Sequence, residues 1–264
     1  MIIDFHTHAF TDALAPRVMD KLEKTGGLPR QSDGTVADTA RRMKEEGVDV
    51  AVVLNIAGTP HATRKVNAFA AEVNARADMV GFGSVHPFSE DLQGDIDHLV
   101  DLGLKGVKLH PHYQQFYVDD EAVFPMYEKL ARAGLWVSFH AGFDPVAPET
   151  DYILPKAALA AHRAVPEMKM ILAHLGGMYH WDEVEAYIAG EEGIWLDTAL
   201  IAGNVAQDQL LRIIGKHGYR RVLLGSDFPW HPSSLEIAMI RQLPIPEEQK
   251  DAILGGNAQA MLGL

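Results

Sequence analysis

The chain has 264 residues, of which 47% are hydrophobic and 22% are charged, as is ordinary for a soluble globular domain. This length buries a sizeable core, which excludes a disordered chain and a small disulfide-stabilised domain. Asp and Glu number 36 against 23 Lys and Arg, a formal net charge of −13, and this acidic excess argues against a nucleic-acid partner.

The sequence has no cysteine, which excludes disulfides, thiolate metal ligands and cysteine nucleophiles. The first ten residues lack the basic and apolar regions of a signal peptide, and the apolar runs are far shorter than the ~20 residues that span a bilayer. We therefore expect a cytoplasmic protein that acts on a small-molecule substrate, with no membrane partner. The unusual count is 13 histidines, and their positions carry the functional argument.

Short apolar runs alternate with amphipathic segments along the whole chain. Most of the runs are rich in Val, Ile and Leu, as expected of buried parallel strands. The expected strands are residues 2–5, 48–54, 79–85, 106–109, 135–139, 168–173, 194–196 and 221–224. The expected helices are residues 36–46, 61–77, 92–102, 121–133, 154–164, 181–189, 205–217 and 235–241.

Eight strand–helix units in strict alternation predict an α/β fold with a parallel sheet, and eight strands close a (β/α)8 TIM barrel. We expect a single domain over residues 1–264, and an intracellular barrel of this kind is compatible with a homo-oligomer. Residues 11–35 are punctuated by Gly and Pro and are long for a βα connection, so they are predicted to form a lid loop over the active site. Residues 247–264 are predicted to form C-terminal helices outside the barrel.

The first strand ends in two histidines. Alternate residues of a strand share a face, so Asp4, His6 and His8 are expected on the same side, which in a barrel is the interior. His6 and His8 would then lie at the C-terminal mouth. Two imidazoles there can hold one divalent ion and leave its other ligands to neighbouring strands.

Metal-capable residues also follow three later strands. His140 follows the fifth strand, His174 the sixth and Asp227 the eighth. Burying such groups at the mouth without partners would cost several kcal/mol. Three histidines and one carboxylate, from strands one, five and eight, form a site suited to one Zn²⁺, with Mn²⁺ and Fe²⁺ as alternatives.

The fourth strand places Lys108 and His110 on one face, near the mouth. Lys108 has three interpretations: a carbamylated bridge between two metals, a cation that holds a substrate carboxylate or carbonyl, or a structural partner of Asp4 or another buried acid. The second is favoured. His110 is expected to contact substrate, and Trp230, on the loop after the eighth strand, is expected to form a wall of the substrate site.

These motifs together resemble the amidohydrolase superfamily. The resemblance rests on the H-x-H of strand one, the single histidines after strands five and six, and the S-D-x-P after strand eight, and it covers nearly the whole chain. The most similar branch is the amidohydrolase-related group that includes aminocarboxymuconate semialdehyde decarboxylase and related hydrolases. The resemblance implies metal ligands at His6, His8, His140 and Asp227, and an acid, base or orienting role for His174.

The expected function is metal-dependent hydrolysis of a small organic substrate. Asp227 can take a proton from a metal-activated water, and His174 can stabilise the developing charge. The alternative is non-oxidative decarboxylation of a small aromatic or unsaturated carboxylic acid. Interior cations for a carboxylate are limited to Lys108, with Arg17 and Arg30 available from residues 11–35, and this supply argues against a dicarboxylate. A catalytically inactive binding protein is the third hypothesis, but it predicts a broken ligand position, and none is broken.

Overall fold

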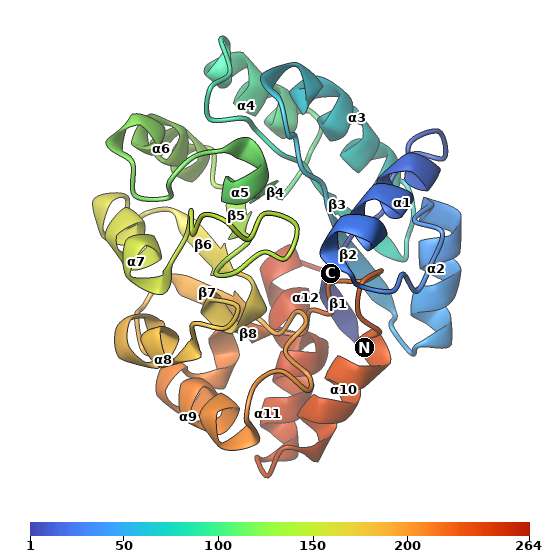
Figure 1. The fold of residues 1–264 in the computed structure, drawn as a ribbon, viewed down its shortest axis with the longest axis vertical. Coiled ribbons are helices and arrows are strands. Elements are labelled where there is room, and N and C mark those ends of the chain that lie inside the picture. The colour runs from blue at the N-terminus through green and yellow to red at the C-terminus, as the bar shows by residue number, and fades with distance from the viewer.

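Eight parallel strands form a ring surrounded by helices in the computed structural model, which describes all of residues 1–264. Figure 1 looks down on this ring. The strands are β1 (Ile3–Thr7), β2 (Val50–Leu54), β3 (Met79–Phe82), β4 (Gly106–Leu109), β5 (Trp136–Phe139), β6 (Lys169–Leu172), β7 (Ile194–Asp197) and β8 (Val222–Leu223).

The strands pair in chain order, in one group of three (β1 to β3) and one group of five (β4 to β8). Two parallel bridges join the groups, Gly83 with Val107 between β3 and β4, and Thr7 with Phe228 between β1 and the segment after β8. The backbone N–H of Phe5 also donates to the carbonyl of Leu224. The ring is therefore closed, and the predicted TIM barrel is confirmed.

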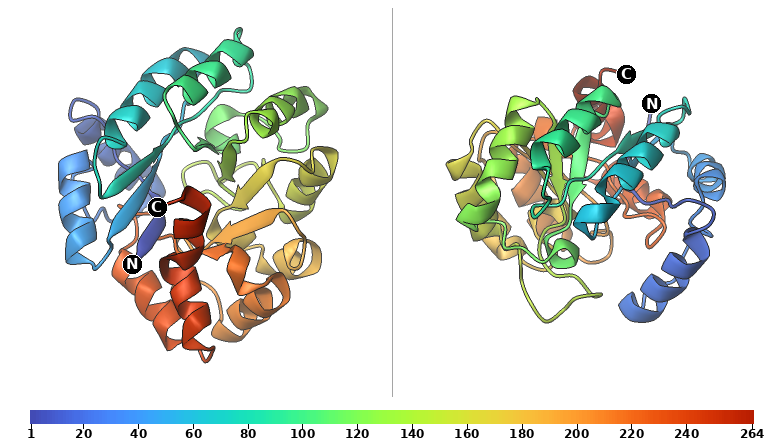
Figure 2. Two further views of the ribbon diagram at one scale, coloured as in Figure 1. Left: turned by 180° about the vertical axis from the view of Figure 1, so that it is seen from behind. Right: turned by 90° about the horizontal axis from the view of Figure 1, so that it is seen from above.

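The helices lie outside the ring and return the chain from one strand to the next (Figures 1 and 2). The α-helices are α1 (Ala15–Gly26), α2 (Val36–Glu45), α3 (Thr63–Val73), α4 (Leu92–Asp101), α5 (Pro111–Gln114), α6 (Phe124–Arg132), α7 (Pro155–Ala164), α8 (Trp181–Glu183), α9 (Gln207–His217), α10 (Ser233–Gln242), α11 (Glu247–Asp251) and α12 (Asn257–Leu262). Single 3₁₀ or π turns are η1 (Pro60–Ala62), η2 (Glu121–Val123), η3 (His174–Gly176), η4 (Val184–Ile188), η5 (Tyr219–Arg221) and η6 (Ala252–Gly256). None of the helices combines the length and the apolar character needed to cross a membrane.

Two apolar cores hold the barrel together. The larger joins the outer faces of the strands to the helices, as in Val107 and Leu109 of β4. The smaller gathers side chains of β1, β2, β3, β6 and β8 with Ala258 and Leu262 of α12. Viewed from behind, α12 lies across the ring of strands (Figure 2), so the C-terminal segment covers the end of the barrel opposite the mouth.

Residues 11–35, expected as a lid loop, are built around helix α1. Pro16 stands in its first turn, and Gly27 ends it in the left-handed conformation with φ of 68°. Proline at a helix start and glycine just after its end are the preferred positions of these residues. The Gly and Pro of this segment therefore mark the two ends of a helix within the segment expected as a lid loop.

Candidate metal centre

His6, His8 and Asp227 converge at the mouth of the barrel. Their ligand atoms all lie within 4.8 Å of one another. Nε2 of His6 and Nε2 of His8 are each 3.2 Å from the same atom, Oδ1 of Asp227. His6 lies in β1, His8 directly follows it, and Asp227 lies in the segment after β8, so closure of the ring is what brings these side chains together.

The partners of the ring nitrogens explain how these imidazoles are oriented. Nδ1 of His8 lies 2.9 Å from the carbonyl oxygen of Leu54, and Nδ1 of His6 lies 2.9 Å from a carboxylate oxygen of Asp197. Both partners are acceptors only, so Nδ1 carries the ring proton in each neutral imidazole. The lone pairs on Nε2 then face the carboxylate of Asp227, which is the arrangement found around a metal ion.

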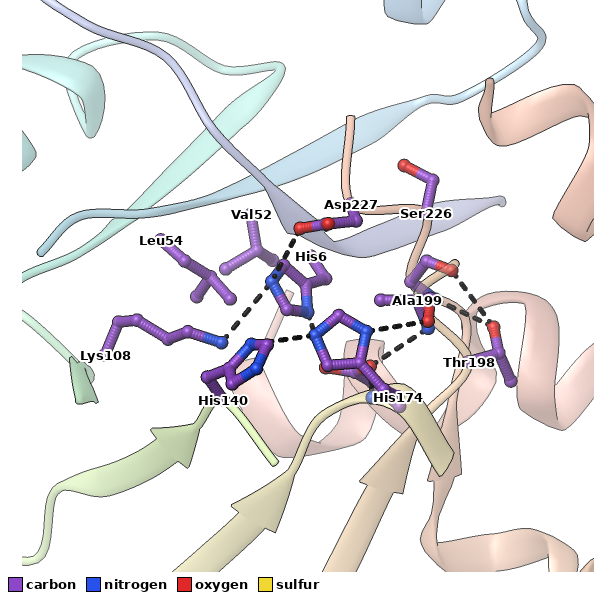
Figure 3. Close-up of polar contacts among 12 residues, drawn as sticks. His6, Val52, Leu54, Lys108, His140, His174, Thr198, Ala199, Ser226 and Asp227 are labelled. Carbon is purple, nitrogen blue, oxygen red and sulfur yellow. Dashed lines mark hydrogen bonds and ion pairs between the residues drawn. The ribbon is translucent and has the colours of Figure 1, made fainter. Parts of the chain in front are cut away.

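His174 and His140 continue this network, as Figure 3 shows. Nδ1 of His174 lies 2.9 Å from the carbonyl oxygen of Ala199, which makes Nε2 of His174 the acceptor for the Nδ1–H of His140 at 3.1 Å. This leaves Nε2 of His140 as a bare lone pair. That atom is buried and has no hydrogen-bond partner.

The residues present fit a divalent metal ion. The donor set of imidazoles and a carboxylate suits Zn²⁺, Mn²⁺ or Fe²⁺, and the unpartnered Nε2 of His140 is the kind of buried atom that a ligand would satisfy. His140 stands outside the 4.8 Å group, with its ring centre 4.7 Å from that of His174. The structure thus brings three of the four expected ligands together. The fourth, His140, lies next to this group, in contact with His174.

Burial keeps His6 and His140 neutral, as ligation requires. It lowers the pKa of His6 to about 4, assisted by the charge of Lys108 and opposed by Asp197 and Asp227. Burial also holds the pKa of His140 well below its ordinary value. Burial acts to raise the pKa of Asp227, but its contact with His8 and its electrostatic interactions with the nearby imidazoles outweigh burial, so the pKa of Asp227 lies below the usual range.

Lys108 points at this centre from β4 (Figure 3). Its Nζ lies 3.3 Å from Nε2 of His6, and the side chain is 1% exposed. Burial lowers its pKa to about 8, while the charges of nearby aspartates, Asp197 foremost, act to raise it. Lys108 is not a partner of Asp4, so that form of the structural interpretation is wrong.

Asp4 does not share a face with His6. The pairing of β1 with β2 shifts register between Asp4 and Thr7. Asp4 instead accepts hydrogen bonds from the hydroxyls of Ser226 and Ser233, the latter on α10, in the layer between barrel and helices. The rule that alternate residues of a strand share a face fails between Asp4 and His6, because an irregularity in the strand reverses the side to which the following residues point.

Asp197 is the functional residue that sequence reasoning missed. It ends β7 and is fully buried, and besides His6 it accepts the backbone N–H groups of His174 and Ala199, each at 3.0 Å. Burial acts to raise its pKa, but the electrostatic interaction and the hydrogen bond with His6 outweigh this and lower it to about 2. The signal was present, since Asp197 directly follows the apolar run 194–196.

One cavity of about 820 Å³ unites the predicted site residues. Its lining includes Leu14, which precedes α1, Val18 of α1, Phe69 of α3 and Phe143, so much of the lining is apolar. Arg17 and Lys21 of α1 line it as well. All of the residues predicted from the sequence to form the site line this cavity, namely His6, His8, Lys108, His110, His140, His174, Asp227 and Trp230.

A closed barrel of parallel strands with histidines and aspartates converging at the strand ends defines the chain as a TIM-barrel enzyme with a metal-capable centre. The chain belongs to the amidohydrolase family, whose model matches residues 3–264. None of the curated protein sequences matches the chain.

Several solved structures share the fold over nearly their whole length. An uncharacterized TIM-barrel protein from Bordetella bronchiseptica is 20% identical, with a TM-score of 0.81 and coverage of 99% of this chain and 98% of that one. The 5-carboxyvanillate decarboxylase from Sphingomonas paucimobilis is 18% identical, with a TM-score of 0.73 and coverage of 100% and 99%. A dihydroxybenzoic acid decarboxylase from Polaromonas, with bound manganese and the inhibitor 2-nitroresorcinol, is 18% identical, with a TM-score of 0.73 and coverage of 100% and 97%.

Proposed function

We propose that this chain catalyses the metal-dependent, non-oxidative decarboxylation of a small aromatic or unsaturated carboxylic acid. The observation that carries the proposal is the position of Lys108, a buried cation beside His6 and Asp227 at the base of a cavity with largely apolar walls. A cation can hold a carboxylate or a ring oxygen there. Apolar walls favour the step because a charged carboxylate leaves as neutral CO₂.

The cavity has features that suit a flat, unsaturated substrate. Trp230, Tyr113 and Phe143 line it, and Tyr113 stacks on the ring of His110 with 3.7 Å between ring centres. Aromatic side chains pack well against planar rings. Two of the structures that share the fold are named as decarboxylases of aromatic acids, which agrees with this proposal.

Each residue has a task in the proposed reaction. Lys108 would hold an oxygen of the substrate, and the bond between the carboxyl carbon and the substrate carbon would break. The electron pair of that bond would remain on the substrate carbon, which takes a proton as CO₂ leaves. His174 or Asp227 would pass on this proton after accepting it from solvent. The contacts of His174 with Ala199 and His140 hold its ring in one orientation for such a transfer.

His6, His8, His140 and Asp227 would hold the metal ion, for which we expect zinc, with manganese or iron as alternatives. The ion would supply a Lewis acid that stabilises negative charge in the cavity and lowers the pKa of water to about 7. Asp197 would keep His6 in the tautomer that offers Nε2 to the ion.

Hydrolysis of a small lactone, ester or amide is the second candidate, and the description of the family as amidohydrolase favours it. In that reaction Asp227 would accept a proton from the attacking water. His174, once protonated, would donate a hydrogen bond to the oxyanion.

The test is an assay of the metal-loaded protein against hydroxylated benzoic acids and, separately, lactones and esters. Release of CO₂ with a proton in place of the carboxyl group supports decarboxylation. Incorporation of ¹⁸O from labelled water into the product, without CO₂, would instead establish hydrolysis. His174→Asn should lower kcat by about 10² to 10⁴-fold. His86→Asn is the matched control, since His86 is a buried histidine that lies outside the cavity.

A further inference from the structure

A second group of metal-capable side chains lies beside the first. His110 follows β4, His112 belongs to α5, and Asp144 lies in the segment after β5. Their exposed fractions are 5%, 5% and 3%. None of the three belongs to the group formed by His6, His8 and Asp227, and the proposed reaction gives His112 and Asp144 no task.

The ligand atoms of these three side chains converge. All lie within 4.8 Å of one another, and Nε2 of His110 is 3.2 Å from Oδ2 of Asp144. Two segments of the chain supply them, because His110 and His112 lie two residues apart at the start of α5 and Asp144 follows β5. Convergence of two imidazoles and a carboxylate from separate elements into a buried space is the arrangement expected of a metal site.

His112 is the unusual member of this cluster. Neither of its ring nitrogens has a hydrogen-bond partner, and Nδ1 of His110 has none either. A buried polar atom without a partner costs about 1–3 kcal/mol. A neutral imidazole always has one nitrogen with a lone pair, so a cation within the cluster would satisfy at least one of these atoms on His112.

The surrounding contacts hold the three groups in place. Gln114 accepts the backbone N–H of His110 at 2.9 Å and donates to the carbonyl oxygens of Ala57 and Val85, which fixes α5 against the barrel. Oδ1 of Asp144 accepts the backbone N–H of Val146 at 2.6 Å, and the other carboxylate oxygen faces His110. Such supporting contacts orient ligands before an ion arrives.

We propose that His110, His112 and Asp144 form a second site for a divalent transition-metal ion, of the type Zn²⁺, Mn²⁺ or Fe²⁺. Two imidazoles and one carboxylate leave further coordination positions free. His110 and Asp144 line the cavity, so these positions are open to substrate or water from that side. The site is separate from a pair of metals bridged at Lys108, because it uses none of the same side chains.

The test is the number of ions bound per chain. The purified protein is stripped with chelator, titrated with Zn²⁺ and, separately, Mn²⁺, and analysed for metal after gel filtration. The wild type should bind two equivalents. His112→Gln should bind one, because loss of a ligand lowers the affinity of this site at least about 100-fold. His86→Gln, which replaces a buried histidine outside both clusters, should still bind two.

Other variants separate this site from the alternatives. Asp144→Asn, with its fold checked by circular dichroism, should also bind one equivalent of metal. This variant replaces His112→Gln in the test if His112→Gln does not fold. His8→Ala should lose the other ion and keep this one. The proposal is overturned if the wild type binds a single ion, or if the variants at His112 and Asp144 both retain two. It is also overturned if only Lys108→Met loses the second ion, which would place that ion at a carbamylated lysine.

Discussion

Two kinds of histidine in this chain differ in the partners of their ring nitrogens. In His6 and His8 an acceptor holds Nδ1, and Nε2 is turned toward Asp227. His162 and His217, which lie in helices, are buried, and their Nε2 atoms lie 2.9 and 3.1 Å from backbone carbonyl oxygens. These contacts tie helix to loop or strand, so the second kind is structural.

Glu236 of α10 is a buried acid outside the metal centre, and it makes stability depend on pH. It is fully buried, accepts the backbone N–H of Ala202 at 2.9 Å and lies 3.2 Å from Nδ1 of His231. Burial raises its pKa from the ordinary 4.5 to about 7, although the contacts with His231 and Ala202 act to lower it. The folded state therefore keeps a proton that the unfolded state loses between pH 4.5 and 7.

The consequence is a loss of stability as pH rises through this window, because ionised Glu236 is disfavoured in the folded state. The raised pKa of Glu236 accounts for a loss of about 3 kcal/mol in the free energy of unfolding across this window. We expect Glu236→Gln to remove this loss, so that its free energy of unfolding falls less between pH 4.5 and 7.5 than that of the wild type. Urea denaturation at the two pH values measures the difference. Glu248→Gln, at an exposed carboxylate, is the control and should follow the wild type. Identical pH dependence in all three proteins would contradict the assignment.

At the scale of elements, helix α1 contributes cationic side chains to the lining of the cavity, and the sequence alone had identified only some of them. Arg17 and Lys21 line the cavity, as does Lys65 of α3, whereas Arg30 pairs with Asp20 and Glu23 outside it. The supply of cations is therefore larger than the sequence suggested. The argument against a substrate with a second carboxylate loses its basis.

We expect the double variant Arg17→Ala/Lys21→Ala to raise KM for a carboxylic acid substrate about 5-fold or more and to leave kcat unchanged. Charges at the rim bind ground state and transition state alike, and each exposed ion pair contributes at most about 1 kcal/mol. Steady-state kinetics at low and high salt measure this, and the effect should shrink at high salt. Lys24→Ala, on the same helix but outside the cavity, is the control. A fall in kcat at constant KM would show that α1 acts on the chemical step instead.

The packing of α3 on β3 depends on a glycine. A Cβ atom on Gly81 would lie 2.1 Å from the carbonyl oxygen of Ala70 in α3. Because this oxygen belongs to the backbone of α3, the clash can be relieved only if the helix moves. We expect Gly81→Ala to lower the free energy of unfolding by about 3 kcal/mol, as overpacking does. Gly215→Ala in α9 is the matched control, because a Cβ there meets nothing within 4 Å and should stabilise the helix by up to about 1 kcal/mol. Chemical denaturation of both variants decides, and equal effects would refute the packing argument.

At the scale of the whole molecule, the candidate metal centre connects the first strand of the barrel to the segment after the last strand. His6 and His8 come from the first strand and Asp227 from the end of the last, so an ion held by them ties β1 to β8. A ligand that binds only the folded state adds about 2.7 kcal/mol at one hundred times its Kd. We expect zinc at that concentration to raise Tm by about 5–10 °C.

Calorimetry with and without zinc measures this shift. In the double variant His6→Ala/His8→Ala the rise should be smaller by the contribution of this centre, while the barrel still folds because the mouth contributes little to the core. His61→Ala, an exposed histidine, is the control. A double variant that responds to zinc as the wild type does would contradict the ligand assignment.

The sequence by itself determined the alternation of strands and helices and the residues at the mouth. Both are local properties: an apolar run makes a buried strand, and a His or Asp directly after it must lie at the strand end. His6, His140, His174 and Asp227 were found in this way, and each lines the cavity.

The tertiary structure decided what depends on residues far apart in the chain. The face taken by Asp4 follows from a register shift against β2, and the role of Asp197 follows from a contact with His6 across 191 residues. The grouping of His112 with Asp144 likewise needs two loops to meet. A residue's type and spacing predict the chemistry it can offer. Only the packing of distant segments fixes its partners, because burial and hydrogen-bond geometry are properties of the closed barrel.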